Sequence, residues 1–170
     1  VRLGVPREWI WSGYDVVDNQ VFADGAAAAR SQGAALRDRL GLPEHYFLFV
    51  GRFAPEKNVL RLLEAYARYR QRAGLRAWGL VLVGGGPQEP MLRARAQELR
   101  DVVFAGFQQT DAVSAYYGLA SCLVLPSVSE TWGLVVNEAM AAGLPVIVSH
   151  RCGCVPELVR AGVNGYVCDP

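Results

Sequence analysis

Short apolar runs alternate with amphipathic stretches from Tyr46 to the end of the chain. The first run, YFLFV at 46–50, is continuous, which predicts a strand buried on both faces of a sheet. The stretch at 58–72 instead repeats its apolar residues at helical spacing, with Arg and Glu on the other face, and therefore predicts an amphipathic helix.

The same alternation continues to the C-terminus, with glycines and prolines between the elements. We expect further strands at 78–83, 102–105, 122–125, 145–149 and 166–168, and helices at 87–100, 111–119, 133–142 and 156–161. Asp111 is the predicted N-cap of its helix. Continuous apolar strands separated by helices predict an α/β fold with a doubly wound parallel sheet of about six strands.

The first 45 residues follow a different pattern. They predict one strand at 10–14 and an Ala-rich helix at 24–40. We interpret 1–45 as a lead-in segment and 46–170 as the domain proper. The first residues look like the interior of a fold, and no helix follows the last predicted strand. We therefore expect a piece of a longer protein.

Composition narrows the class of protein. The chain has 170 residues, of which 52% are hydrophobic and 19% charged, with a net charge of +1. This balance excludes a disordered chain and argues against a nucleic-acid partner, because no broad positive field is present. No apolar run approaches the ~20 residues that a membrane-spanning helix needs.

The four cysteines are too few for a disulfide scaffold in a chain of this length. Cys152 and Cys154 are spaced too tightly for a zinc pair, and only two histidines are present, so we predict no metal site. Buried or incidental thiols are the better interpretation, and they favour a cytoplasmic location.

A single lysine, Lys57, stands among seventeen basic residues. It lies six residues after Gly51, beyond the first strand of the domain, and ligands of doubly wound sheets bind beyond the carboxyl ends of the strands. Gly51 would let the backbone approach a ligand, and Arg52 and Lys57 suit a diphosphate. The alternative is a pair of solvated surface cations.

Three glycines, Gly84 to Gly86, follow the second strand. They form neither a dinucleotide fingerprint nor a P-loop, because the required spacings are missing. A glycine-rich turn into a helix is compatible with the approach of a phosphate or sugar, and equally with a plain tight turn.

Glu130 and Glu138 are the only charged residues in the 39 positions between Asp111 and Arg151. Glu130 lies where a strand gives way to a helix, and Glu138 lies within that apolar helix, from which it can lean back toward the loop of Glu130. A buried carboxylate needs a partner. Either ligand hydroxyls such as those of ribose supply it, or a nearby Arg or backbone N–H does. Free N–H groups at 131–134 would favour an anionic diphosphate.

Three segments together carry a resemblance to a known family. GRFAPEKN, VGGGP and SETWGLVVNEAMAAGLPVIVS resemble the donor-binding half of the family 4, or group 1, retaining glycosyltransferases, which have the two-domain GT-B fold. Glu130 and Glu138 match the E-x7-E motif of that family, and the stretches at 153–159 and 162–168 resemble the family's segment after the fifth strand. The resemblance covers about 46–170 and places 1–45 in the interdomain region.

The resemblance implies roles for individual residues. Arg52 and Lys57 would hold the diphosphate of a nucleoside-diphosphate sugar, Glu138 the ribose hydroxyls, and Glu130 the transferred sugar. The predicted donor site also takes in Gly51, Gly84, Phe107 beside the base, and the backbone of Thr131, Trp132, Gly133 and Leu134.

The resemblance also implies a mechanism and partners. Sugar is transferred with retention, and the two cations stabilise the leaving diphosphate without a metal or other cofactor. The acceptor, a saccharide, lipid or small metabolite, would be held by the chain's own N-terminal domain. We expect that domain to be absent here and to make any contact with the inner membrane face, so this piece alone should bind donor weakly and transfer little.

Two departures from the family pattern leave the sugar preference open. Trp132 stands where Phe is frequent, and Cys152 and Cys154 interrupt a turn that is usually rich in glycine.

Two other functions remain as alternatives. A nicotinamide-dependent oxidoreductase would need GxGxxG after the first strand, which the sequence lacks. A non-catalytic nucleotide- or protein-binding module would be expected to have lost one of four residues that are all present: Arg52, Lys57, Glu130 and Glu138.

Overall fold

The computed structural model describes residues 4, 6–9 and 15–170. Across these residues one sheet of six parallel strands has the order β3-β2-β1-β4-β5-β6. The strands are β1 (Tyr46–Val50), β2 (Gly79–Val83), β3 (Val102–Gly106), β4 (Cys122–Leu125), β5 (Val146–Ser149) and β6 (Gly165–Cys168). The predicted doubly wound parallel sheet is confirmed.

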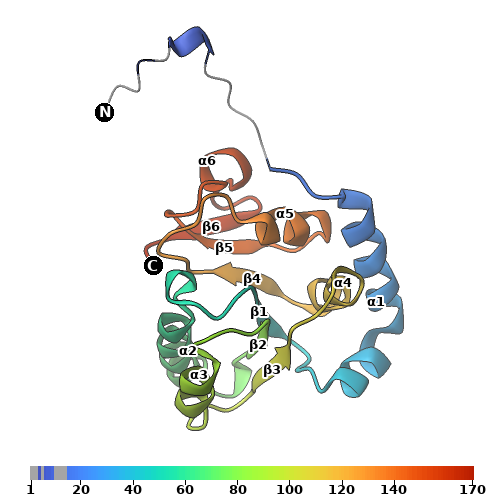
Figure 1. The fold of residues 1–170 in the computed structure, drawn as a ribbon. Coiled ribbons are helices and arrows are strands. Elements are labelled where there is room, and N and C mark those ends of the chain that lie inside the picture. The colour runs from blue at the N-terminus through green and yellow to red at the C-terminus, as the bar shows by residue number, and fades with distance from the viewer. Residues whose placement is uncertain (1–3, 5, 10–14) are drawn as a thin grey trace.

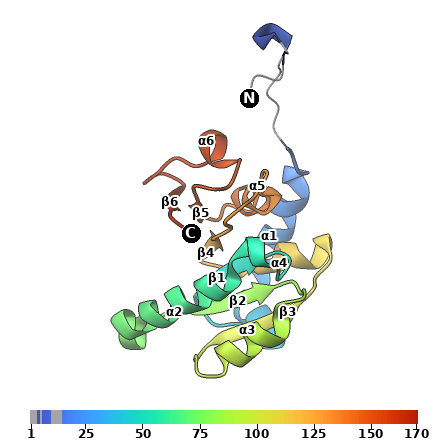
Figure 2. The same cartoon turned by 60° about the vertical axis from the view of Figure 1, so that its left-hand side comes forward.

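Helices cover both faces of the sheet. They are α1 (Asn19–Leu40), α2 (Val59–Ala73), α3 (Glu89–Ala96), α4 (Thr110–Leu119), α5 (Leu134–Ala141) and the short α6 (Val155–Leu158). Figure 1 shows α2 and α3 on one side of the sheet and α1, α4 and α5 on the other. In the turned view of Figure 2, α2 and α3 lie in front of the sheet. The four central strands are largely buried, as their continuous apolar runs predict, whereas the edge strands β3 and β6 are partly exposed.

Element boundaries differ from the prediction at the helix ends. The predicted helix at 87–100 becomes α3, which ends at Ala96 because the chain must turn back to enter β3. Asp111 does not cap α4: Gln109 is the N-cap, and Asp111 lies in the first turn. The predicted helix at 156–161 becomes the single turn of α6, which begins at Val155 and ends at Leu158.

The Ala-rich helix α1 begins earlier than predicted and packs closely on the domain. It starts at Asn19, where the Asp18 carboxylate accepts from two first-turn N–H groups. Gly118 of α4 lies so close that a Cβ there would be 2.7 Å from the Ala26 Cα of α1. Arg37 donates to the last carbonyl of α4 at 3.2 Å. The core therefore includes α1, whereas the predicted strand at 10–14 lies outside the described residues.

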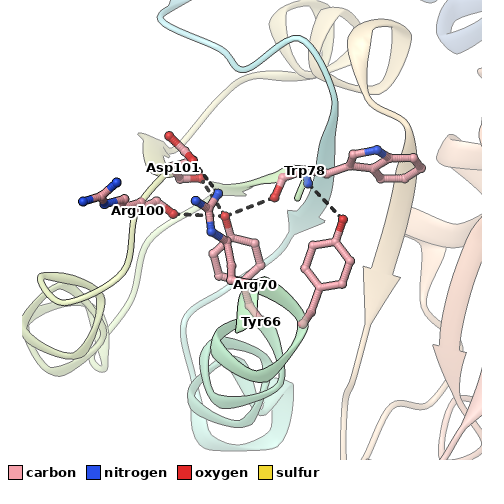
Figure 3. A network of polar contacts seen from close by, with 6 residues as sticks. Tyr66, Arg70, Trp78, Arg100 and Asp101 are labelled. Carbon is pink, nitrogen blue, oxygen red and sulfur yellow. Dashed lines mark hydrogen bonds and ion pairs between the residues drawn. The ribbon is translucent and has the colours of Figure 1, made fainter. Parts of the chain in front are cut away.

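A polar network ties α2 to the strands at the amino edge of the sheet (Figure 3). The buried Tyr66 hydroxyl lies within 3.0–3.3 Å of the carbonyl oxygens of Trp78, Arg100 and Asp101. Arg70, one turn along α2, pairs with the Asp101 carboxylate. Burial raises the pKa of Tyr66, so the hydroxyl stays protonated as a donor. The network fixes the end of α2 that lies far from the carboxyl edge.

Strands β1 and β4 separate toward their carboxyl ends. They pair only at Phe47–Cys122 and Leu48–Leu123, and each strand continues for two residues beyond its last pair. The chain runs from β1 to β2 on one side, while β4 and β5 follow on the other, so the strand order reverses between β1 and β4. Ligands of open α/β sheets bind in the crevice at such a switch point.

Candidate functional site

An ion pair spans this crevice between the loops that follow β1 and β4. Lys57 lies in a single 3-10 turn after β1, and its ammonium pairs with the Glu130 carboxylate after β4. The side chains are only 21% and 13% exposed. An ammonium group has three N–H donors, so Lys57 can hold Glu130 and still donate to an incoming anion. The predicted site residues Lys57 and Glu130 are thus brought together.

Two further hydrogen bonds join the same loops. Asn58 adopts the left-handed backbone conformation, with φ at 56°, and its amide donates to the Pro126 carbonyl at 3.2 Å. The Val128 N–H donates to the Glu56 carbonyl at 2.9 Å. Sequence reasoning missed these contacts. Asn after a single turn was the available signal, because Asn tolerates the left-handed region better than most residues.

The glycines after β2 hold the loop that carries Arg52. Phe53 donates its N–H to the Gly85 carbonyl at 2.8 Å. A Cβ at Gly84 would lie 1.9 Å from the Gly51 carbonyl oxygen, and one at Gly86 would lie 2.7 Å from the Phe53 carbonyl oxygen. The contact between the two loops therefore requires these glycines whatever ligand binds, which favours the tight-turn alternative.

Arg52 projects from this anchored backbone into solvent. Its side chain is exposed, and it forms no ion pair or hydrogen bond with the residues that the structure describes. The planar guanidinium therefore keeps its donors free for an anion that can accept two hydrogen bonds at once, such as phosphate. The site thus has one cation already paired across the crevice and one that is free at its rim.

The Cys152–Cys154 segment packs against the loop that carries Glu130. Gly153 donates its N–H to the Glu130 carbonyl at 3.0 Å, and a Cβ on Gly153 would lie 2.0 Å from the Thr131 carbonyl oxygen. Burial raises the pKa of the Cys152 thiol to about 12 and that of Cys154 to about 11, so both stay protonated. The prediction of buried thiols is confirmed for these two residues.

The N-terminus of α5 lies next to Glu130. Gly133 takes a left-handed conformation with φ at 103° and leads into Leu134 without a side-chain cap. The first N–H groups of a helix have no acceptor within it, so this end of α5 offers donors to an anion. The Trp132 indole N–H donates to the Asn137 side chain at 2.9 Å, which fixes the indole against the first turns of α5.

Glu138 lies one turn further along α5 and is half-buried. Its carboxylate accepts a 2.5 Å hydrogen bond from the Tyr117 phenol of α4. Glu138 therefore has a partner within the protein, but it is a tyrosine hydroxyl and not the expected Arg or backbone N–H, and no pattern in the sequence pointed to Tyr117. Burial raises the pKa of Glu138, and the Tyr117 hydrogen bond opposes that rise.

Phe107 follows β3, the edge strand, and lies apart from these contacts. Its ring is 74% exposed, and the neighbouring Gln108 side chain donates to the Ala105 carbonyl at 2.7 Å. Two strands separate β3 from β4 in the sheet, so Phe107 occupies the far end of the carboxyl edge.

A cavity of about 580 Å³ lies elsewhere, between α2 and the C-terminal residues, and includes none of the predicted site residues. No group of three or more metal-ligating side chains occurs in the described part of the chain. None of the helices within 15–170 is long and apolar enough to cross a membrane.

Comparison with known proteins reveals clear similarity. The profile of the family "Glycosyl transferases group 1" matches residues 35–170. The alpha-D-kanosaminyltransferase of Streptomyces kanamyceticus is 36% identical over 153 residues, which are 88% of this chain and 38% of that protein. The chain spans about a third of the length of the curated relatives it matches.

Two solved structures share the fold. The C-terminal domain of a glycosyl transferase group 1 family protein from Francisella tularensis superposes with a TM-score of 0.75 at 24% identity, covering 91% of this chain and 80% of that domain. Anabaena HepE in complex with UDP-glucose gives a TM-score of 0.74 at 23% identity, covering 98% of this chain and 45% of HepE.

Proposed function

We propose that this chain, which belongs to the group 1 glycosyl transferases, is the donor-binding half of a retaining glycosyltransferase. The Lys57–Glu130 pair across the β1–β4 crevice is the observation that carries the proposal. It puts a cation and a carboxylate at the position where a doubly wound sheet binds nucleotides. The donor would be a nucleoside-diphosphate sugar, and HepE provides a structural neighbour that was solved with UDP-glucose.

The diphosphate would lie between Lys57, Arg52 and the N-terminus of α5. Lys57 would provide a point charge, Arg52 a planar fork, and the N–H groups around Gly133 and Leu134 the positive end of the α5 dipole. Gly51 and Gly84 keep the Arg52 loop close to the sheet. Three positive features would thus hold one small anion in a chain of near-neutral net charge.

The remaining roles concern the nucleoside and the sugar, which lie on either side of the diphosphate in the donor. Glu138 would accept hydrogen bonds from the ribose hydroxyls, and Phe107 would border the base at the β3 end of the edge. Glu130 would face the transferred sugar, with the backbone of Thr131 and Trp132 beside it. The Trp132 indole fixed by Asn137 would shape the sugar pocket.

In the proposed reaction the bond between sugar C1 and the diphosphate oxygen breaks while the acceptor hydroxyl forms a new bond to C1 on the same face. The electron pair of the breaking bond goes to the diphosphate oxygen, which gains negative charge and takes up the proton of the acceptor hydroxyl. Lys57 and Arg52 would stabilise that developing charge, and the proposed reaction uses no metal ion. The acceptor would be held by an N-terminal domain outside this chain, and we propose a cytoplasmic location for the reaction.

Glu138→Ala tests the ribose assignment. The variant loses a charged acceptor, so we expect nucleoside-diphosphate affinity to fall by roughly 1–3 kcal/mol. The measurement is isothermal titration calorimetry with the tightest-binding of UDP, GDP and ADP. Glu138→Gln keeps the side-chain size and should lose part of the same affinity.

The matched control is a ligand rather than a variant. The 2′,3′-dideoxy analogue of the chosen nucleotide lacks the hydroxyls that Glu138 would bind, so wild type and Glu138→Ala should bind it equally. An equal loss of affinity for both ligands would refute the ribose role and point to a general disturbance of α5.

A further inference from the structure

Tyr117 is buried between three helices and donates its hydroxyl toward a residue of the site. Its side chain is fully buried, and the ring of Phe22 from α1 meets it edge-on, with centroids 6.0 Å apart and planes at 80°. The next residue, Gly118, packs against the Ala26 backbone without room for a side chain. The phenol is therefore held from α1 and α4 while its oxygen reaches Glu138 on α5.

The Tyr117–Glu138 bond joins the last turn of α4 to the second turn of α5. Helix α5 follows β4 and so begins at the carboxyl edge of the sheet, and because helical side chains lean toward the N-terminus of their helix, the Glu138 side chain leans toward that edge. The Tyr117 hydroxyl donates a hydrogen bond to the Glu138 Oε2 atom at 2.5 Å. The other carboxylate oxygen, Oε1, makes no hydrogen bond to a residue within 15–170, and it remains available to a ligand.

We infer that Tyr117 is a positioning residue for nucleotide binding: its hydroxyl fixes the Glu138 carboxylate so that the second oxygen is presented to the ribose hydroxyls. The inference rests on the proposed function. A half-buried carboxylate on an apolar helix would otherwise populate several rotamers. The hydrogen bond to a rigid phenol favours one of them. Because the ring is clamped by α1, the packing of the N-terminal helix supports the site.

Few other charged groups face Glu138. It is the sole titratable side chain on α5, and none is present on β5. Strand β4 contributes Cys122, whose pKa burial raises to about 11. From α1, Arg30 donates to the Ala142 carbonyl at the C-terminal end of α5. The Tyr117 hydrogen bond is thus the local contact that favours the ionised carboxylate over the protonated form.

The test is Tyr117→Phe, with Tyr116→Phe as the matched control. Tyr116 is the adjacent residue of α4, also buried, and its hydroxyl bonds to no residue in the described ranges. Both variants lose one oxygen atom from the same helix. We expect Tyr117→Phe to weaken UDP binding by about 3- to 20-fold in calorimetry, and Tyr116→Phe to leave it unchanged.

The pH profile separates positioning from a merely structural role. Ribose hydroxyls would bind the ionised carboxylate, so wild-type affinity should fall as pH drops through the pKa of Glu138. Without the phenol that pKa rises, and the fall in Tyr117→Phe should begin at a higher pH. In a Glu138→Ala background, Tyr117→Phe should cause no further loss of affinity.

Three results would overturn the inference. Unchanged affinity and pH profile in Tyr117→Phe, with wild type binding UDP, overturn it alone. So does a loss that is equal at every pH and persists in the Glu138→Ala background. Failure of the wild type to bind UDP, GDP or ADP overturns the proposed function as well.

Discussion

Lys57→Ala is expected to weaken nucleoside-diphosphate binding by about 2–3 kcal/mol, which corresponds to a ~30- to 150-fold loss of affinity. The variant removes the cation that spans the crevice and leaves the Glu130 carboxylate, which is only 13% exposed, without its counter-charge beside the bound donor. Binding of the parent nucleoside, which carries no phosphate, should change by less than about twofold. Calorimetric titration of both ligands provides the comparison.

Arg61→Ala is the control for Lys57→Ala. Arg61 is an exposed cation of α2 that pairs with Glu64 in the same helix, so its loss removes one positive charge without touching the crevice. It should leave both affinities within about twofold of the wild type. If Lys57→Ala lowers nucleoside and diphosphate binding equally, Lys57 supports the loop structure and does not bind phosphate.

Gly84→Ala is expected to have the largest effect on stability, at about 3–5 kcal/mol. The new Cβ would lie 1.9 Å from the Gly51 carbonyl oxygen, and the backbone of Gly84 has φ at 134°. Relief of that clash must move the Gly51 loop away from β2 and carry Arg52 with it. Urea unfolding measures the loss, and nucleoside-diphosphate affinity should fall in parallel.

Gly162→Ala is the control that measures the cost of a positive φ at alanine without a steric clash. Gly162 has φ at 75°, but a Cβ there would meet nothing within 4 Å. This variant should therefore cost only about 1–2 kcal/mol, the strain of a left-handed alanine. Equal losses in Gly84→Ala and Gly162→Ala would show that the two loops do not need their close contact.

The sheet could be predicted from the sequence because buried parallel strands require continuous apolar runs. The run at 46–50 and the run at 122–125 match β1 and β4 residue for residue. Helix ends were predicted less well because tertiary turns set them. The stretch after Ala96 has a helical composition, yet it turns to enter β3.

The candidate site could be predicted only in part. Rare charges in an apolar stretch identified Glu130 and Glu138, and the single lysine identified Lys57. That β1 lies beside β4, and so brings Lys57 to Glu130, depends on the strand order, which apolar runs do not encode. Tyr117 was missed for a similar reason, because in the sequence it is one more aromatic residue on an apolar helix.

The donor site is tested most directly by titrating the wild-type chain with UDP, GDP, ADP and NAD in one calorimetric series. We expect one nucleoside diphosphate to bind in preference to NAD, with the largest NMR shifts in the crevice between the β1 and β4 loops. Preferential NAD binding would support a nicotinamide-dependent oxidoreductase instead. No binding by any of the four would contradict the donor site and leave a non-catalytic module.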